Sequence, residues 1–594
     1  MRARKSAAPG ANAPAPWTDS REQLPPDEAS LQTLDPRDAA ETALLRAISV
    51  DRESDADADG PDSVADRRTR GNMAGTTGTG TWRSRREAVR SLWPLLPILL
   101  VQGVFAWRLL VTNTAFLDEA TYMWSGRLVA DHLVHGKSTP EFQTFFSGAP
   151  VIYPVLAAVA SKLGALTAAR ALSLVCMLLA TSAVFLTGRR LHGAMAGFFA
   201  AALFAALGPT LHLSSYATFD AMALSMLAWS TYFVIRFAYG ESRNALLYGA
   251  ILMVLADCTK YACLLWNPVI ILLAATTGPG FAAWRCSRSW NLQRFAMVST
   301  TLLALAFVIG RQPYFTGFDH TTLQRAAAGT PTGTIVSHVI QWVGPLLALG
   351  VLGLLLALWQ LRRGTLSRPQ AATMAVLLTG GVLAPANQLR IHTLLSLEKH
   401  ADIGATFAAI PAGYLLARLV RTLGGSRVSG VGRVSGIGRV RYAFAAVFVM
   451  AVSLIPLNVI GVRSGTELHN TWPNSTPLIS ALKPLVQKGS ANYLVEDYDV
   501  PAYYLPSINY WQWHDTVSGS WYDSATRTTL TGASALKAEI VAHHYQVIVL
   551  DYSESPTTDA AITGTIGKAG YRKVAKISLV SGNGTKLTYD IWVV

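Results

Sequence analysis

Two adjacent carboxylates, Asp118 and Glu119, are the residues best suited to acid–base chemistry, and they lie in the segment AFLDEATYMWSGR. A positioned carboxylate can accept the proton of a hydroxyl group while the oxygen attacks an electrophilic carbon. The pair is therefore a candidate general base. The alternative is that the two carboxylates only hydrate the end of an apolar helix, and the residues alone leave both interpretations open.

Two further charged residues stand at the ends of apolar stretches. Asp220 begins one such stretch, and Tyr216 precedes it by about one turn. A carboxylate that enters an apolar helix costs free energy unless it faces water or a partner, so the two residues are a candidate second acidic or acceptor site. Lys260 lies between two apolar runs, and Asp257 precedes it at helical spacing. Lys260 either pairs with Asp257 along a helix or supplies charge to a phosphate group.

The segment richest in polar groups covers residues 385–404, PANQLRIHTLLSLEKHADIG. Its titratable and charged residues are Arg390, His392, Glu398, Lys399, His400 and Asp402. Arginine and lysine hold phosphate groups through charge-assisted hydrogen bonds, so this segment is a candidate phosphate-binding loop.

The elements that position these residues are membrane helices. Of the 594 residues, 51% are hydrophobic and 14% are charged, whereas soluble domains carry roughly 25% charged residues. Apolar runs of about 16 to 25 residues recur, and such runs are long enough to cross a hydrocarbon core. The net charge of +14 fits basic cytoplasmic loops and does not require a nucleic-acid partner. The cysteines show neither metal-ligand spacing nor a disulfide framework; they are Cys176, Cys258, Cys263 and Cys286.

The distribution of charge predicts how the chain crosses the membrane. A cluster of arginines between Arg83 and Arg90 precedes the first apolar run, which places the N-terminus in the cytoplasm. The stretch 150–166 is short and contains Lys162, so we expect an interfacial or re-entrant helix that does not cross. About eleven transmembrane helices remain, at 93–112, 168–188, 193–211, 218–238, 245–260, 262–277, 296–311, 336–360, 370–388, 402–420 and 443–461. With this assignment five basic clusters fall inside, and the odd number of spans places the C-terminus outside the cytoplasm.

Three regions follow from these patterns. Residues 1–82 have too few apolar side chains to form a core and are predicted to be a disordered cytoplasmic tail. Residues 83–462 form the transmembrane region. Residues 463–594 alternate strand-like segments (NYLVED, YQVIVLDY, RKVAKISLV and KLTYDIWVV) with helical ones (GASALKAEIVAHH and TTDAAITGTIGKAG). This alternation predicts a small extracytoplasmic α/β domain.

Several of these motifs resemble the GT-C superfamily of polytopic glycosyltransferases, in particular the branch of protein O-mannosyltransferases and the lipid A aminoarabinose transferase. The segments that show the resemblance are the Asp118–Glu119 pair, SYATFDAMAL, TKYA and GRRLHG. The resemblance covers about residues 90–461. The wider context is similar to actinobacterial members. The resemblance implies an α-helical polytopic membrane protein of GT-C type, in which an acidic residue of the first outer loop acts on the acceptor. Asp118 is then the expected base, with Glu119 second.

The same resemblance assigns basic outer-loop residues to the carrier phosphate. The matching positions are Lys260, Arg390 and Lys399, with His392 and His400 in the same loop. Relatives often have a Lys-Pro-Pro segment after the first loop, where this chain has Ile152-Tyr153-Pro154. Tyr153 is therefore added to the candidate acceptor site, and Lys137 can substitute for the missing lysine.

The implied function is transfer of a sugar from a polyprenyl-phosphate carrier to an acceptor hydroxyl in the cell envelope, on a protein, a lipid or a cell-wall glycan. The enzyme would be a hexosyl- or pentosyltransferase of the plasma membrane, in contact with membrane lipid. The outer loops have no Asp-x-Asp motif of nucleotide-sugar enzymes, so we expect no essential nucleotide and no other cofactor. A divalent metal ion stays open as an alternative that no motif supports.

Two other classes stay open. A transporter or flippase would also have many spans, although the sequence lacks the internal repeats typical of one. A glycan-binding envelope assembly protein would use the aromatic residues of the C-terminal domain, such as Trp511 and Tyr522.

Overall fold

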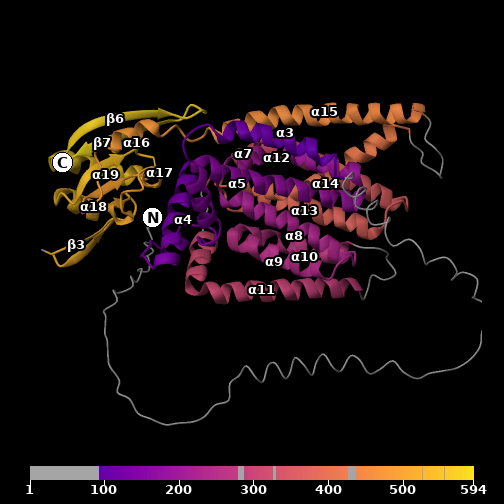
Figure 1. Ribbon diagram of the computed structural model, residues 1–594, viewed down its shortest axis with the longest axis horizontal. Coiled ribbons are helices and arrows are strands. Elements are labelled where there is room, and N and C mark those ends of the chain that lie inside the picture. The colour runs from indigo at the N-terminus through magenta and orange to yellow at the C-terminus, as the bar shows by residue number, and fades with distance from the viewer. Residues whose placement is uncertain (1–91, 278–286, 325–328, 426–435, 525, 554) are drawn as a thin grey trace, which may run out of the picture. The chain divides into compact units, whose positions relative to one another are not determined.

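The computed structural model describes residues 92–594, apart from residues 278–286, 325–328, 426–435, 525 and 554. The tail predicted for residues 1–82 lies outside the described residues. Most of the described chain up to His469 is helical, and a small sheet domain follows (Figure 1).

The first helices carry the acidic pair and the predicted interfacial segment. Helix α3 (Leu95–Leu110) is apolar, and α4 (Leu117–His135) is a polar helix with Asp118 in its first turn. Helix α5 (Tyr153–His192) has non-helical backbone angles at Gly164 and Ala165. This break separates residues 153–163 from the long apolar part, where the sequence predicted that a short helix ends before the next span.

Every predicted span coincides with helical structure. The remaining helices of this region are α6 (Ala194–Ala205), α7 (Gly208–Ser215), α8 (Phe219–Ala238), α9 (Asn244–Thr259), α10 (Asn267–Thr276), α11 (Ser287–Phe318), α12 (Thr332–Arg362), α13 (Arg368–Arg390), α14 (Leu397–Leu423) and α15 (Gly436–His469). Among the described residues, 7 helices are long and apolar enough to cross a membrane, or 8 if α6 and α7, bent by 69°, form one span. The shorter apolar helices coincide with the three other predicted spans, so the count of eleven stays a prediction.

Helix α14 occupies the centre of the helical region. It packs against α6, α12 and α13, and 89% of its most apolar window is buried. Figure 1 shows α12, α13 and α14 running side by side. The close approach of α12 to α14 depends on glycine, because a Cβ atom at Gly353 of α12 would overlap the carbonyl group of Pro411 on α14. This packing fixes the position of the first turn of α14, which carries Lys399 and His400.

The C-terminal domain has a five-stranded mixed sheet with the order β2-β1-β5-β7-β6. Strand β1 (Asn492–Val495) is parallel to β2 (Trp513–His514) and to β5 (Tyr545–Leu550). Strand β7 (Lys586–Val593) is antiparallel to β5 and to β6 (Arg572–Val580). The four predicted strands and both predicted helices, α18 (Gly532–Val541) and α19 (Pro556–Lys568), are confirmed.

Alternate residues of the strands belong to two different hydrophobic cores, one on each face of the sheet. Leu494 and Ile548 face α18 and α19, whereas Tyr493 and Val547 face the other way. The second core includes α16 (Thr476–Leu482), α17 (Asp499–Tyr504) and apolar residues of α4. The sheet domain therefore packs against the helix that begins beside Asp118.

Candidate active site

Asp118 forms an ion pair with Lys399, across nearly 300 residues of sequence. Lys399 Nζ lies 2.5 Å from Asp118 Oδ2, and the Asp118 side chain is 35% exposed. The two residues stand in the first turns of α4 and α14. Asp118 is thus a charged carboxylate that remains open to solvent on one side.

Glu119 has a different environment from its neighbour. Both of its oxygens accept hydrogen bonds from Arg170, at 2.8 Å and 2.7 Å, and both side chains are almost fully buried. The backbone amides of Ala217 and Phe116 also donate to Glu119, at 2.7 Å and 3.0 Å. With four hydrogen bonds and no solvent access, Glu119 has no room to accept a proton from an acceptor. The structure corrects the sequence analysis here, because Glu119 holds the backbone around Asp118.

The loop between α3 and α4 is fixed from two sides. Arg170 donates to the carbonyl oxygens of Leu110, Thr112 and Thr114, at 2.6 Å to 3.1 Å. From the sheet domain, Tyr504 Oη accepts a hydrogen bond of 2.8 Å from the amide of Ala115. Burial raises the pKa of Tyr504 to about 12, so the phenol stays neutral at physiological pH. These contacts hold Asp118 in place before any substrate binds.

A second ion pair joins Asp220 in the first turn of α8 to Lys260 at the end of α9. Both side chains are buried, and Lys260 Nζ lies 4.9 Å from the centre of the Phe219 ring. Asp257 accepts a hydrogen bond from Asn267 Nδ2 instead, at 2.8 Å. The partner of Lys260 is therefore the distant Asp220, and the local Asp257–Lys260 pair considered from the sequence is wrong.

Three of the predicted phosphate-binding residues line one cavity of about 430 Å³: Lys260, Arg390 and His400. Arg390 is exposed, and its guanidinium donates to Asn387 Oδ1 at 3.0 Å. His400 is held by Gln388, whose Nε2 lies 3.1 Å from His400 Nδ1. A lysine and an arginine at a cavity that also contains amide and hydroxyl groups can bind a phosphate group. Lys399, next to His400 in α14, places Asp118 beside this region.

The other candidates lie elsewhere. Lys137 is paired with Asp131, with Nζ 2.9 Å from Oδ2, and does not line the phosphate cavity. His392 is exposed and also lies outside the lining. Tyr153 is fully buried with its hydroxyl 3.0 Å from Ser173 Oγ, and Tyr216 donates to the carbonyl of His469 at 2.8 Å. The assignments of Lys137, Tyr153 and Tyr216 are corrected, because local pairing or core packing already occupies each side chain. The role of His392 stays a prediction.

Sequence reasoning missed Arg170. It stands within a predicted apolar span, where a charged residue is expensive and usually has a partner inside the protein. That signal was available in the sequence. The partner of Arg170 could not be predicted from the sequence, because Glu119 and Arg170 are brought together only by the packing of α4 on α5.

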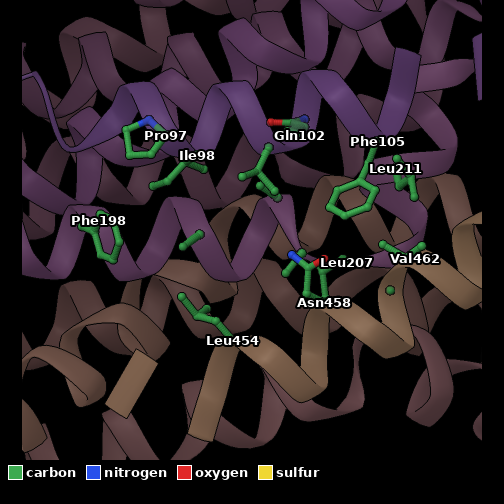
Figure 2. A pocket seen from close by; sticks show the side chains of 15 residues that line it. Pro97, Ile98, Gln102, Phe105, Phe198, Leu207, Leu211, Leu454, Asn458 and Val462 are labelled. Carbon is green, nitrogen blue, oxygen red and sulfur yellow. The ribbon is translucent and has the colours of Figure 1, made fainter. Parts of the chain in front are cut away.

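A separate apolar cavity of about 230 Å³ lies between α3, α6, α7 and α15 (Figure 2). Its lining includes two polar side chains, Gln102 and Asn458, and Gln102 is already bonded to Ser214 and to Thr181. Figure 2 shows mostly aliphatic and aromatic side chains around it, including Phe105 and Leu454. This cavity has no charged lining residue and is not the site of the charge chemistry.

Comparison with known proteins agrees with this geometry. Residues 149–311 match the family described as dolichyl-phosphate-mannose-protein mannosyltransferase. ArnT from Cupriavidus metallidurans in the apo state has a TM-score of 0.54 and 16% identity, over 84% of this chain and 97% of that one. The chain therefore has the same fold as ArnT. A second structure, ArnT bound to undecaprenyl phosphate, has a TM-score of 0.53 and 14% identity, over 84% of this chain and 98% of that one. No curated protein matches the sequence.

In this fold, four helices run from the candidate site to an arginine-rich end. Helices α8, α9, α13 and α14 each have one end at Asp220, Lys260, Arg390 or Lys399. Arginines lie at or near the opposite ends of the same helices: Arg236, Arg243, Arg368, Arg418 and Arg421. The candidate site and the arginines are therefore separated by the length of the helices.

Proposed function

We propose that the chain transfers a sugar from a polyprenyl-phosphate carrier to an acceptor hydroxyl on the extracytoplasmic side of the membrane. The carrying observation is that a partly exposed carboxylate, Asp118, is ion-paired with Lys399, whose neighbour in α14, His400, lines a cavity together with Lys260 and Arg390. The undecaprenyl phosphate bound to ArnT, a protein of the same fold, supports a lipid phosphate as the carrier group.

The proposed reaction is a single displacement. The acceptor oxygen forms a bond to the anomeric carbon, and the bond between that carbon and the phosphate oxygen breaks. The electron pair stays on the phosphate, whose charge Lys260 and Arg390 stabilise. Asp118 accepts the proton of the acceptor hydroxyl as the new bond forms. Attack from the side opposite the phosphate inverts the anomeric centre.

Lys399 connects the base to the phosphate. The ammonium group of Lys399 occupies one oxygen of Asp118. A carrier phosphate near His400 offers Lys399 a second anionic partner, which weakens its hold on Asp118. That oxygen is then free to accept a hydrogen bond from the acceptor hydroxyl, so we expect the acceptor to bind more tightly once the carrier is bound.

The sugar is a hexose or a pentose in this proposal, and the acceptor is a protein, a lipid or a glycan of the envelope. Because Lys260 and Arg390 are available to stabilise the leaving phosphate, we expect neither a cofactor nor a metal to be required. A transfer assay with purified full-length protein and a panel of radiolabelled polyprenyl-phosphate sugars identifies the sugar.

Asp118→Asn keeps the shape of the side chain and removes the basic oxygen. A general base contributes typically about 10²–10⁴-fold to rate, so we expect turnover in the transfer assay to fall by that factor. Thermal stability should change little, because Asp118 is partly exposed. Carrier affinity should be retained or rise, because Lys399 is then free for the carrier phosphate. Glu141→Gln is the matched control, since Glu141 is an exposed carboxylate in the loop after α4. Full turnover by Asp118→Asn would remove the proposed base, whereas no transfer by the parent protein with any sugar of the panel would favour a transporter or an assembly protein.

Arg390→Gln tests the phosphate site. Hydrogen bonds to charged groups contribute about 1.5–3 kcal/mol, so affinity for a polyprenyl-phosphate sugar should fall about tenfold or more in an equilibrium binding measurement. Arg463→Gln is the control, because the Arg463 side chain is 83% exposed and pairs only along its own helix with Glu467. Equal affinity of the Arg390 variant and the parent protein would show that Arg390 does not contact the carrier.

A further inference from the structure

A third cavity, of about 740 Å³, lies between α4 and the sheet domain. It shares no lining residue with the phosphate cavity. Its walls come from the middle of α4, from Lys162 on α5, and from Lys488 and the loop 506–511 of the sheet domain. The volume falls within the roughly 300–1,000 Å³ typical of ligand sites.

The charges around this cavity are mostly positive. Four cations line it, with one carboxylate; these are Arg127, Lys137, Lys162, Lys488 and Asp131. Arg127 is anchored, because its Nη1 donates to the carbonyl of Tyr503 at 3.0 Å, and Lys137 pairs with Asp131. Lys162 and Lys488 are exposed and form no ion pair among the described residues. Cations from two different parts of the fold therefore face one space, which favours an anionic ligand.

Aromatic side chains complete the cavity. Trp511 is 56% exposed, and its ring centroid lies 5.2 Å from that of Tyr510 in an edge arrangement. Tyr510 Oη donates to Ser138 Oγ at 2.9 Å, so the loop is fixed to the segment that follows α4. An indole held open to solvent offers a flat apolar face, against which the C–H face of a sugar ring can pack. Ser507 and Asn509 add hydrogen-bonding groups to the same wall.

We propose that this cavity binds an anionic carbohydrate, a sugar segment that carries phosphate or carboxylate groups, as part of the acceptor. This inference rests on the proposed transfer reaction. Asp118 and Arg127 lie on the same helix, about 14 Å apart along its axis at 1.5 Å per residue. A ligand seated at Trp511 can therefore extend along α4 to the base.

A membrane surface is the alternative source of negative charge. Lipid headgroups would meet cations arranged on an open face. Here Lys488 and Trp511 belong to the sheet domain and enclose a cavity together with α4. A partly exposed tryptophan beside amide and hydroxyl groups favours a carbohydrate over a phospholipid headgroup.

The test measures binding to full-length protein in nanodiscs of neutral lipid, with no carrier added. The probes are a phosphorylated maltoheptaose and the unmodified sugar, followed by calorimetry and by tryptophan fluorescence. We expect the phosphorylated sugar to bind and the unmodified sugar to bind at least about tenfold more weakly. The double variant Lys162→Gln/Lys488→Gln and the variant Trp511→Ala should each weaken binding by about tenfold. Raised salt should weaken binding of the phosphorylated sugar, because its charges are screened.

Two exposed residues of the sheet domain outside the cavity provide matched controls, Lys576→Gln and Tyr522→Ala. Equal weakening by the controls, or equal binding of both sugars, would overturn the inference, as would the absence of binding. In mixed-lipid nanodiscs, the enrichment of anionic lipid around the protein can be measured for the parent and for the lysine variants. If the lysine variants lose this enrichment and still bind the phosphorylated sugar as the parent does, the cavity is assigned to the membrane surface instead. Transfer activity without binding of the phosphorylated sugar would reject the proposed carbohydrate cavity and leave the proposed transfer reaction intact. Sugar binding with full turnover by Asp118→Asn would reject the proposed role of Asp118 alone.

Discussion

Asp118 and Glu119 show how two adjacent residues of similar chemistry acquire different roles. Successive residues of a helix point about 100° apart, so the two carboxylates meet different neighbours. Glu119 enters the core and meets Arg170, whereas Asp118 stays at the surface and meets Lys399. The buried pair orders the loop, whereas the partly exposed carboxylate of Asp118 is available for chemistry.

Glu119→Gln should therefore affect stability more than Asp118→Asn does. Removing one partner of a buried ion pair typically costs about 3–5 kcal/mol, because the other charge is left buried without compensation. We expect a large fall in the apparent melting temperature of the Glu119 variant in detergent, together with a loss of activity. Asp118→Asn should melt close to the parent protein. A Glu119→Gln protein as stable as the parent would contradict the structural role assigned to this residue.

At the residue scale, the sequence predicted the chemical groups of the site better than their partners. Lys260, Arg390 and His400 line one cavity, and Asp118 pairs with the neighbour of His400, whereas the roles of these residues at a phosphate and a hydroxyl stay predictions. The pairs Asp118–Lys399 and Asp220–Lys260 could not be predicted, because each joins different helices. Their spacing in sequence carries no information on which helices pack together.

The helices are defined by hydropathy, and their packing is defined by small residues. Helix α15 crosses the break between α6 and α7, and Gly461 lies against the backbone there. A Cβ atom at Gly461 would overlap the carbonyl oxygen of Ala206. Backbone carbonyls cannot move aside as a flexible side chain can, so this contact depends on glycine.

Gly461→Ala should separate α15 from α6 and lower the melting temperature of the protein in detergent. Gly103→Ala on α3 is the matched control, because an added Cβ there meets nothing within 4 Å. Alanine is a better helix former than glycine by about 1 kcal/mol. The control should therefore be neutral or more stable, and a stabilised Gly461→Ala variant would show that α15 does not pack closely at this point.

At the element scale, sequence patterns succeeded where they were long. The apolar runs and the strands of eight or nine residues, β6 and β7, gave clear signals. The two-residue strand β2 and the hairpin of β3 (Ser520–Asp523) and β4 (Thr528–Thr531) were missed. The hairpin is mostly exposed on both faces, so it lacks the alternation of apolar and polar residues by which strands are recognised.

At the scale of the whole molecule, the proposed transfer reaction depends on which side of the membrane the site faces. The helices that begin or end at Asp220, Lys260, Arg390 and Lys399 have arginines at or near their other ends. Arginine and lysine are more frequent in cytoplasmic loops than in loops on the other side. The arginine-rich end is therefore expected inside, and the candidate site, with the sheet domain packed on α4, is expected outside.

Single cysteines in a chain without its four native cysteines test this orientation in intact cells. Exposed positions at the site end are Glu141, Leu395 and Tyr522, and exposed positions at the arginine-rich end are Asn244 and Thr365. An impermeant thiol reagent added outside should label the first three and leave the other two unlabelled until the membrane is permeabilised. The reverse pattern would place the site in the cytoplasm, where an envelope acceptor could not reach Asp118. Labelling of Leu395 without Tyr522 would mean that the chain between α14 and the sheet domain crosses the membrane a different number of times than predicted.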